Sequence, residues 1–340
     1  MGAPKIALRA AQEAMPPSRP KPEPSRAKLI TAFAAVYILW GSTFLAIRYA
    51  VATVPPFLMA GTRHLVAGAV LYPLARLRSG ERPTRANWSA AALLGALLLF
   101  GGNGGVSWAE QYVPSGVTAL LVASVSLWMV LLEWLRPGGA RPTWRVTVGL
   151  VLGFSGLVLL VGPGNLFPGS GGGGRVDPLG AIVLVLASLS WATGSIFSRH
   201  VKLPRYPLLG TAMQSLAGGA LLLVVGLLTG QEMRLDWGAT SLASVLALGY
   251  LIVFGSLLGF SAYTWLLGVA PPARVATYAY VNPVVAMLLG WALAGERITL
   301  RTLAAAAIIV AAVVLVISSR PQPIPSTGQE LAAAPEKAKA

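Results

Sequence analysis

The sequence predicts an all-α membrane protein with ten transmembrane helices arranged as two five-helix repeats. Three observations lead to this fold class. The 340 residues are 55% hydrophobic and only 11% charged, whereas a soluble domain carries about 25% charged residues. The apolar residues gather in runs of about 20, the length that crosses a bilayer as a helix. The last five runs repeat features of the first five.

Ten apolar segments are long enough to span a bilayer. In chain order they are residues 29–49, 56–76, 88–108, 114–135, 143–162, 178–199, 206–229, 241–267, 273–294 and 300–319. The first follows a basic, proline-rich stretch without a small-residue cleavage site, so we expect an uncleaved membrane helix. The eighth and ninth are separated only by Ala270, Pro271 and Pro272, which is the weakest break in the series.

Composition divides the rest of the chain into tails and a linker. Residues 1–28 and 320–340 are rich in proline, alanine and charge, which predicts disordered tails. Residues 163–177 contain a run of glycine, which predicts a flexible external linker. The expected repeats are therefore residues 29–162 and residues 178–319.

The net charge of +15 carries information about topology. If the N-terminus is cytoplasmic and the chain crosses ten times, most of the 26 Lys and Arg residues fall in the tails and in cytoplasmic loops. This bias predicts a protein of the cell inner membrane with both termini in the cytoplasm. A nucleic-acid partner would require one continuous basic face, so we expect the lipid bilayer and a small molecule as partners and no nucleic acid.

Several chemistries are excluded by residue types that are missing. The chain has no cysteine and only two histidines, His64 and His200, which excludes a disulfide framework and a multi-histidine metal site. The glycine run at 169–174 is not followed by Lys-Ser or Lys-Thr, so no phosphate-binding loop for ATP is expected. The stretch 153–156, Gly-Phe-Ser-Gly, is similar to a motif of intramembrane serine proteases, but neither histidine has the context of its base. We expect no cofactor and no enzymatic activity.

The two halves share sequence features at corresponding places. The stretch 40–48, which begins with Trp and ends with Arg, has a weak counterpart at 191–199. An R-x-T-x-R pattern begins at Arg141 and again at Arg297, and an apolar helix follows each copy. Because each half has five spans, an odd number, the second half enters the membrane in the opposite sense. The halves are then inverted repeats, which place a substrate near the midplane and expose it alternately to each side.

Motifs distributed over the ten segments resemble a known family. They are Trp40-Gly41-Ser42-Thr43, Arg63, Gly102-Asn103, Pro114-Ser115-Gly116, Ala279-Tyr280-Val281-Asn282-Pro283 and Gly295-Glu296. In their order and placement they resemble the EamA family of the drug/metabolite transporter superfamily, and within it the YedA-like exporters. The resemblance implies a secondary transporter that exports small metabolites, amino acids or amphipathic drugs. Ser126 stands where the family often has proline, which predicts a fourth helix straighter than the ninth.

Arg63 is the most informative single residue, because a charge in mid-helix costs at least about 2.5–3.5 kcal/mol on insertion scales. It therefore requires a partner or a wet cavity, and contact with a substrate or a gate is one reading. A snorkelling arginine and a helix-packing ion pair with Glu110 are the alternatives. Its neighbour His64 is interpreted as a satisfied packing or interfacial histidine, with a proton relay as the alternative.

Further polar and aromatic residues lie at mid-depth of other predicted helices. Asn103 lies among four glycines, which predicts either a bend beside a cavity or close helix packing. Pro283 frees the carbonyl of Ala279 in the ninth helix. Aromatic walls with a few hydroxyls suit a small amphipathic solute. The predicted substrate-binding residues are Trp40, Ser42, Thr43, Arg63, Asn103, Trp191, Ser195, Tyr278, Tyr280 and Asn282.

Coupling, assembly and the alternative to transport depend on other residues. We expect Glu110 and Pro283 to act in coupling or gating, since proton antiport usually uses a carboxylate in the path; facilitated export is the other reading. Gly149-x-x-x-Gly153 predicts helix packing and leaves a homodimer open. The alternative function is a non-transporting membrane scaffold or assembly protein, against which the polar residues at mid-membrane argue.

Overall fold

The structure is a computed structural model that describes residues 25–136, 142–161, 176–198, 200–270 and 277–318, and every regular element in these ranges is a helix. The first half contains α2 (Arg26–Ala50), α3 (Pro56–Ser79), α4 (Arg85–Leu94), η1 (Gly95–Gly104), α5 (Gly105–Ala109), α6 (Ser115–Val122), α7 (Val125–Leu135) and α8 (Trp144–Val161). The second half contains α9 (Pro178–Phe197), α10 (Pro207–Leu228), η3 (Gln231–Arg234), α11 (Leu242–Tyr250), η4 (Leu251–Leu258), α12 (Gly259–Val269), α14 (Tyr278–Ala294) and α15 (Leu300–Ser318).

The predicted all-α membrane class is confirmed. Among the described residues, eight continuous helical stretches are long and apolar enough to cross a bilayer. Two shorter apolar helices, Val281–Ala294 and Leu300–Val316, occupy the ninth and tenth predicted segments. The count of ten spans and the inverted relation of the halves stay predictions. Most of the predicted tails, most of the glycine linker and Arg141 lie outside the described residues.

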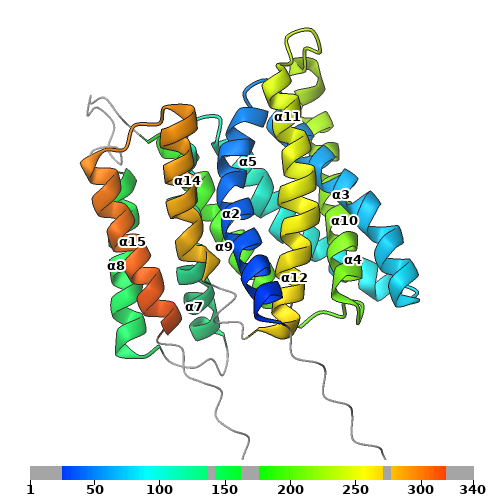
Figure 1. Ribbon diagram of the computed structural model, residues 1–340, viewed down its shortest axis with the longest axis horizontal. Coiled ribbons are helices and arrows are strands. Elements are labelled where there is room, and N and C mark those ends of the chain that lie inside the picture. The colour runs from blue at the N-terminus through cyan, green and yellow to red at the C-terminus, as the bar shows by residue number, and fades with distance from the viewer. Residues whose placement is uncertain (1–24, 137–141, 162–175, 199, 271–276, 319–340) are drawn as a thin grey trace, which may run out of the picture.

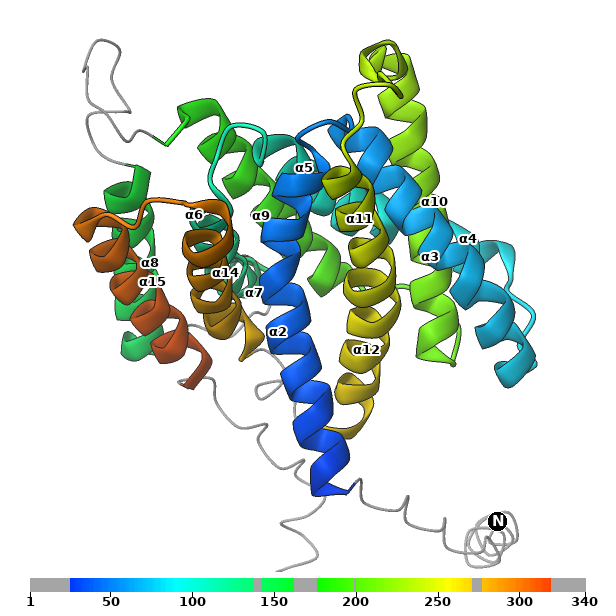
Figure 2. The ribbon, with the colours of Figure 1, turned by 45° about the horizontal axis from the view of Figure 1, so that its top comes forward.

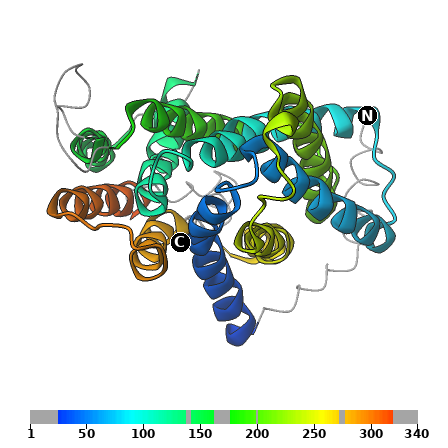
Figure 3. The same cartoon turned by 90° about the horizontal axis from the view of Figure 1, so that it is seen from above.

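The two halves interlock, since the helices of one half pack mainly on helices of the other. α3 packs along α10, and α8 packs along α15. α2 packs on α14, α12 and α11, while α9 packs in the same way on η1, α5, α6 and α7. Seen from above, the helices form two rows, with α8 and α15 at one end and α3 and α10 toward the other (Figures 2 and 3). This reciprocal pattern is the one that a two-fold relation between the halves would produce.

Glycines allow the closest of these approaches. A Cβ atom at Gly95 would lie 2.7 Å from the backbone nitrogen of Gly218, so η1 and α10 meet backbone to backbone. On α8, Gly149 faces Val316 and Gly153 faces Leu127, which belong to other helices of the same chain. The predicted packing role of Gly149 and Gly153 is thus met within one chain, and these glycines do not form an exposed face for a dimer.

The third helical stretch of each half contains a π-helical segment. These segments are η1, which starts at Gly95, and η4, which starts at Leu251. The number of residues between these two starts equals the number between Arg141 and Arg297, where the two copies of the R-x-T-x-R pattern begin. A π segment widens the helix and leaves carbonyl groups without their usual partners, and such segments often occur at functional sites. The glycine cluster at the end of η1 and the start of α5 also packs closely, with Gly102 against Trp191 and Gly105 against Ala187. The close packing predicted for this cluster is therefore observed and Gly102 and Asn103 line the cavity described below, while a bend stays a prediction.

The fourth helical stretch is interrupted, and the prediction that it is straighter than the ninth stays a prediction. The stretch is divided into α6 and α7 at Ala123 and Ser124, whereas α14 runs continuously past Pro283. At the break the hydroxyl of Ser124 donates to the carbonyl oxygen of Leu121 at 2.6 Å, and the amide of Leu127 donates to the carbonyl oxygen of Ser124 at 2.9 Å. A serine that bonds to the backbone competes with the regular helical ladder, so a proline is not needed for the break.

Candidate substrate site

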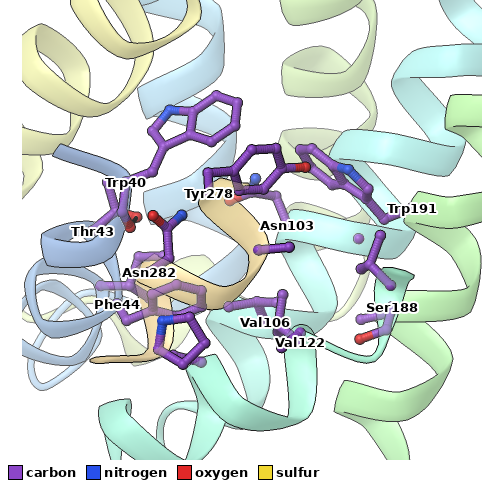
Figure 4. Close-up of a pocket in the computed structure, with 18 of the residues that line it drawn as sticks. Trp40, Thr43, Phe44, Asn103, Val106, Val122, Ser188, Trp191, Tyr278 and Asn282 are labelled. Carbon is purple, nitrogen blue, oxygen red and sulfur yellow. Dashed lines mark hydrogen bonds between the residues drawn. The ribbon is translucent and has the colours of Figure 1, made fainter. Parts of the chain in front are cut away.

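A cavity of about 120 Å³ lies between the halves. The first and fourth helical stretches of each half form most of its wall, with three residues from the third stretch of the first half and one each from α3 and α12 (Figure 4). Its lining residues are Trp40, Thr43, Phe44, Ile47, Arg63, Gly102, Asn103, Val106, Ala119, Val122, Ala123, Val125, Ala187, Ser188, Trp191, Phe260, Tyr278, Ala279, Asn282 and Pro283. Most of these side chains are apolar or aromatic, so the few polar groups decide what the cavity recognises.

Arg63, on α3, is the one charged side chain among the lining residues, and the residue is only 4% exposed. Its Nε donates to the hydroxyl of Ser256 on η4 at 2.9 Å, and its Nη1 donates to Oδ1 of Asn103 on η1 at 3.4 Å. The two π segments therefore hold the guanidinium from both sides. It does not snorkel to the surface, and none of the described carboxylates lies within 4.0 Å of it. Neither the snorkelling arginine nor the ion pair with Glu110 is observed.

Aromatic rings form one end of the cavity. The indole Nε1 of Trp40 donates to the carbonyl oxygen of Gly255, in η4, at 3.3 Å. The ring centroid of Trp40 lies 4.9 Å from that of Tyr263, 5.2 Å from that of Tyr278 and 5.6 Å from that of Phe260. These edge and tilted contacts fix the indole of α2 against α12 and α14. Trp191, from α9, lines the cavity on another side (Figure 4).

The ninth helix presents an amide and a proline to the cavity. Asn282 is buried, and in the orientation that satisfies its amide the nitrogen donates to the carbonyl oxygens of Tyr37 at 3.2 Å and Tyr278 at 3.3 Å. Pro283 follows directly, and it cannot donate to the carbonyl of Ala279, which also lines the cavity. The amide oxygen of Asn282 and this carbonyl are acceptors for a polar group of a solute.

The structure brings most of the predicted site residues to this cavity. These are Trp40, Thr43, Arg63, Asn103, Trp191, Tyr278, Asn282 and Pro283. Ser42 is outside the lining, and its hydroxyl bonds to the hydroxyl of Tyr250 at 2.7 Å. Ser195 is also outside it and donates to the carbonyl oxygen of Trp191 at 2.8 Å. The side chain of Tyr280 lies outside the described part of the structure. Substrate binding by these residues stays a prediction.

Sequence reasoning missed the lining residues that carry little or no polar chemistry. Phe44, Val122 and Phe260 have no feature that separates them from other apolar helix residues. Ser188 could have been found, because it precedes Trp191 by one helical turn and so shares its face.

Two buried titratable side chains lie outside the lining. The carboxylate oxygens of Glu110 and both ring nitrogens of His64 are buried without a hydrogen-bond partner among the described residues. His64 contacts Phe260, with ring centroids 6.5 Å apart. The ring therefore packs as expected, but the expectation that its nitrogens are hydrogen-bonded is wrong. Glu110 caps the end of α5 and is 1% exposed. Its role in coupling stays a prediction, and the observation in its favour is a buried carboxylate that makes no hydrogen bond among the described residues.

The polar cluster that sequence reasoning missed is centred on Glu296. Its carboxylate accepts from the backbone amide and the hydroxyl of Ser115, both at 2.8 Å, and from the amide of Gly116 at 3.1 Å. Nε of Arg48 lies 3.4 Å from the same carboxylate. We call these four residues the Glu296 cluster. It ties the end of α2 and the start of α6 to the turn after α14.

Interlocked membrane helices around a small cavity, with an arginine and two amides facing it, define a polytopic transporter of small solutes. The chain belongs to the EamA-like transporter family, whose family model matches residues 27–162 and, separately, residues 178–318. The relatives described next are also named as transporters, and the chain is accordingly a membrane transporter.

Two curated relatives and one solved structure show how far the similarity extends. The uncharacterized inner membrane transporter YedA of Escherichia coli strain K12 is 40% identical over 289 residues, which cover 85% of this chain and 90% of YedA. The uncharacterized transporter YvbV of Bacillus subtilis is 27% identical over 86% of this chain and 92% of its own length. A solved crystal structure matches with a TM-score of 0.58 at 23% identity, covering 88% of this chain and all of the other. This last similarity shows the fold alone.

Proposed function

We propose that the protein is a secondary transporter that exports small metabolites, amino acids or amphipathic drugs by alternating access. The cavity between the interlocked halves is the substrate site, and rocking of the halves exposes it to each side of the membrane in turn. The observation that carries the proposal is Arg63: a buried guanidinium held by both π segments, without a carboxylate partner, at the wall of a cavity. A structural scaffold gains nothing from such a costly group.

The Glu296 cluster supports alternating access, because it joins α2 and α6 of the first half to α14 of the second at one end of the bundle. Tyr49 adds a hydrogen bond from its hydroxyl to the carbonyl oxygen of Leu293 at 2.7 Å. In the predicted topology this end faces away from the cytoplasm, and the protein resides in the inner membrane with both termini inside. Export then requires these contacts to open.

Counterflow in proteoliposomes tests the proposal. Protein is reconstituted with a pooled panel of labelled amino acids, organic acids and cationic drugs, and the wild type is compared with Asn282→Ala. Ser195→Ala is the matched control, because its hydroxyl bonds within α9 and lies outside the cavity lining. We expect wild type and Ser195→Ala to exchange at least one solute and Asn282→Ala to lose that exchange. Folded protein that exchanges nothing across the panel would favour the scaffold.

Glu110 is the candidate group for proton coupling, since its carboxylate is buried and neither oxygen has a hydrogen-bond partner among the described residues. An imposed pH gradient should drive flux of the substrate in the wild type and drive none in Glu110→Gln, while counterflow without a gradient persists. If the pH-driven flux of Glu110→Gln equals that of the wild type, transport is facilitated export and Glu110 has no part in coupling.

A further inference from the structure

Among the described residues that line the cavity there is one formal charge, and it is positive. Arg63 faces no carboxylate within 4.0 Å among the described residues, and the other lining residues are uncharged. From this we infer that the substrate is a small organic monocarboxylate whose carboxylate binds Arg63, and that an amino group is not required. The inference rests on the proposed function and names the substrate class of the same site.

The guanidinium has donors left for such a ligand. Of its five N–H groups, one on Nε serves Ser256 and one on Nη1 serves Asn103. The second proton of Nη1 and both protons of Nη2 have no acceptor among the described residues. A Cβ at residue 255 would lie 2.9 Å from Nη2, so the glycine at this position lets the guanidinium pack closely against η4. A carboxylate can accept two parallel hydrogen bonds from the Nη edge of an arginine.

Burial makes a counter-charge for Arg63 energetically important. A charge removed from water is costly unless it is paired and hydrogen-bonded, and Arg63 is 4% exposed. A bound carboxylate supplies the counter-charge, whereas a cationic solute would meet a second positive charge in a poorly solvated cavity. The single arginine also favours a monoanion over a phosphate ester, whose second negative charge would have no cation among the described lining residues.

The other lining residues limit the size and polarity of the part of the ligand that lies beyond its carboxylate. Rings of Trp40, Trp191 and Tyr278 and the apolar side chains of α6 and α7 surround the space beside the guanidinium. The lining offers no carboxylate for an ammonium group, only neutral oxygens such as that of Asn282. A cavity of about 120 Å³ admits a compact aromatic or branched aliphatic body.

Equilibrium binding to protein in lipid nanodiscs tests the inference without requiring transport. The probes are three molecules of the same shape: benzoate, benzamide and benzylamine. Isovalerate and isovaleramide repeat the comparison with an aliphatic body. We expect each acid to bind at least about tenfold more tightly than its amide, as a charge-assisted bidentate pair predicts, and benzylamine to bind most weakly.

Arg63→Gln removes the positive charge. Arg63→Lys keeps the charge but lacks the two parallel N–H groups with which a guanidinium binds a carboxylate. We expect the ratio of acid to amide affinity to fall to about one in Arg63→Gln and to take an intermediate value in Arg63→Lys. Arg234→Gln, at an exposed position on η3, is the matched control and should keep the wild-type ratio. The ratio among probes on wild-type protein gives an answer even if the Arg63 variants fail to fold.

Three results would overturn the inference: equal affinity for acid and amide, tightest binding of benzylamine, or no measurable binding of either acid by folded wild-type protein. The inference would also be overturned if the ratio of acid to amide affinity were the same in Arg63→Gln as in the wild type. Binding of acids without any flux would leave the inference standing and overturn the proposed transport instead.

Discussion

Replacing Glu296 by glutamine is expected to release α2 and α6 from the end of α14 and to open the cavity at that end. The change is nearly isosteric, so it removes charge without creating a void. In the wild type the carboxylate accepts three hydrogen bonds, two from Ser115 and one from Gly116, and it faces Arg48. The glutamine NH₂ group would face N–H donors at one of these places.

The hydrogen bonds from Glu296 to α6 contribute most of the free energy that Glu296→Gln would remove. Arg48 is 38% exposed and its Nε lies 3.4 Å from the carboxylate, so solvent screening limits this ion pair to about 0–1 kcal/mol. A hydrogen bond to a charged group contributes about 1.5–3 kcal/mol, and these bonds also meet the positive end of the α6 dipole. Since glutamine retains one acceptor oxygen, we take the total loss as about 3 kcal/mol. This shifts a two-state equilibrium roughly 100-fold toward the open form.

The absence of cysteine in the chain makes this shift measurable. A single cysteine at Ala119, one turn after Ser115 and 1% exposed at the cavity wall, reports access from that end. Cells carrying the Ala119→Cys protein are treated with a membrane-impermeant maleimide from outside. When opening is fast relative to the reaction, the labelling rate follows the population of the open form. We expect Glu296→Gln to raise this rate by up to about 100-fold.

Glu133→Gln provides the matched control. Glu133 pairs with Arg136 at 3.7 Å, but both side chains are more than 40% exposed. Such a pair contributes about 0–1 kcal/mol, so the labelling rate should not change. The reasoning is refuted if Glu296→Gln labels at the rate of its parent, or if Glu133→Gln accelerates labelling equally, which would indicate general loosening.

Three more predictions concern other contacts, the first with a control variant. Gly68→Ala should destabilise detergent-solubilised protein by about 1–3 kcal/mol, seen as a lower melting temperature, because its Cβ would lie 2.8 Å from the backbone nitrogen of Leu216. Gly249→Ala is the control, because a Cβ at this position would have no atom within 4 Å, and it should leave the melting temperature unchanged. An equal fall of the melting temperature in both variants would contradict this explanation. Pro283→Ala restores an N–H to α14 and should slow counterflow while leaving the affinity for substrate within about threefold; unchanged flux would argue against a gating role. Ser42→Ala should leave counterflow unchanged, since the side chain lies outside the cavity lining; a loss above about tenfold would place it in the site.

The sequence predicts the parts of the site that are chemically unusual for their surroundings. A charge at Arg63, amides at Asn103 and Asn282 and indoles at Trp40 and Trp191 are conspicuous in apolar segments, and the cavity contains all five. Direction on the helix is less predictable. Adjacent residues point about 100° apart, so the segment boundaries cannot decide between Ser42, which faces Tyr250, and Thr43, which faces the cavity.

The features that sequence reasoning missed depend on contacts between distant residues. Glu296 lies in a turn, and its partner Ser115 is 181 positions away. Nothing local to either residue shows that one caps the other. The break after α6 was missed for a different reason: a serine that bonds to its own backbone is ambiguous in sequence. The apolar lining residue Phe260 carries no signal, because its role comes only from its neighbours.

The interlocking of the halves has a consequence for biogenesis. Arg63 leaves the ribosome 193 residues before its partner Ser256, and Tyr37 precedes its hydrogen-bond partner Thr277 by 240. At about 5–20 residues per second, the guanidinium waits about 10–40 s for that partner. During this interval α2 and α3 are in the bilayer without the second-half helices that cover them. A ribosome that stalls after the first half therefore leaves a charged, incompletely packed intermediate, which is a natural target for membrane chaperones and quality-control proteases.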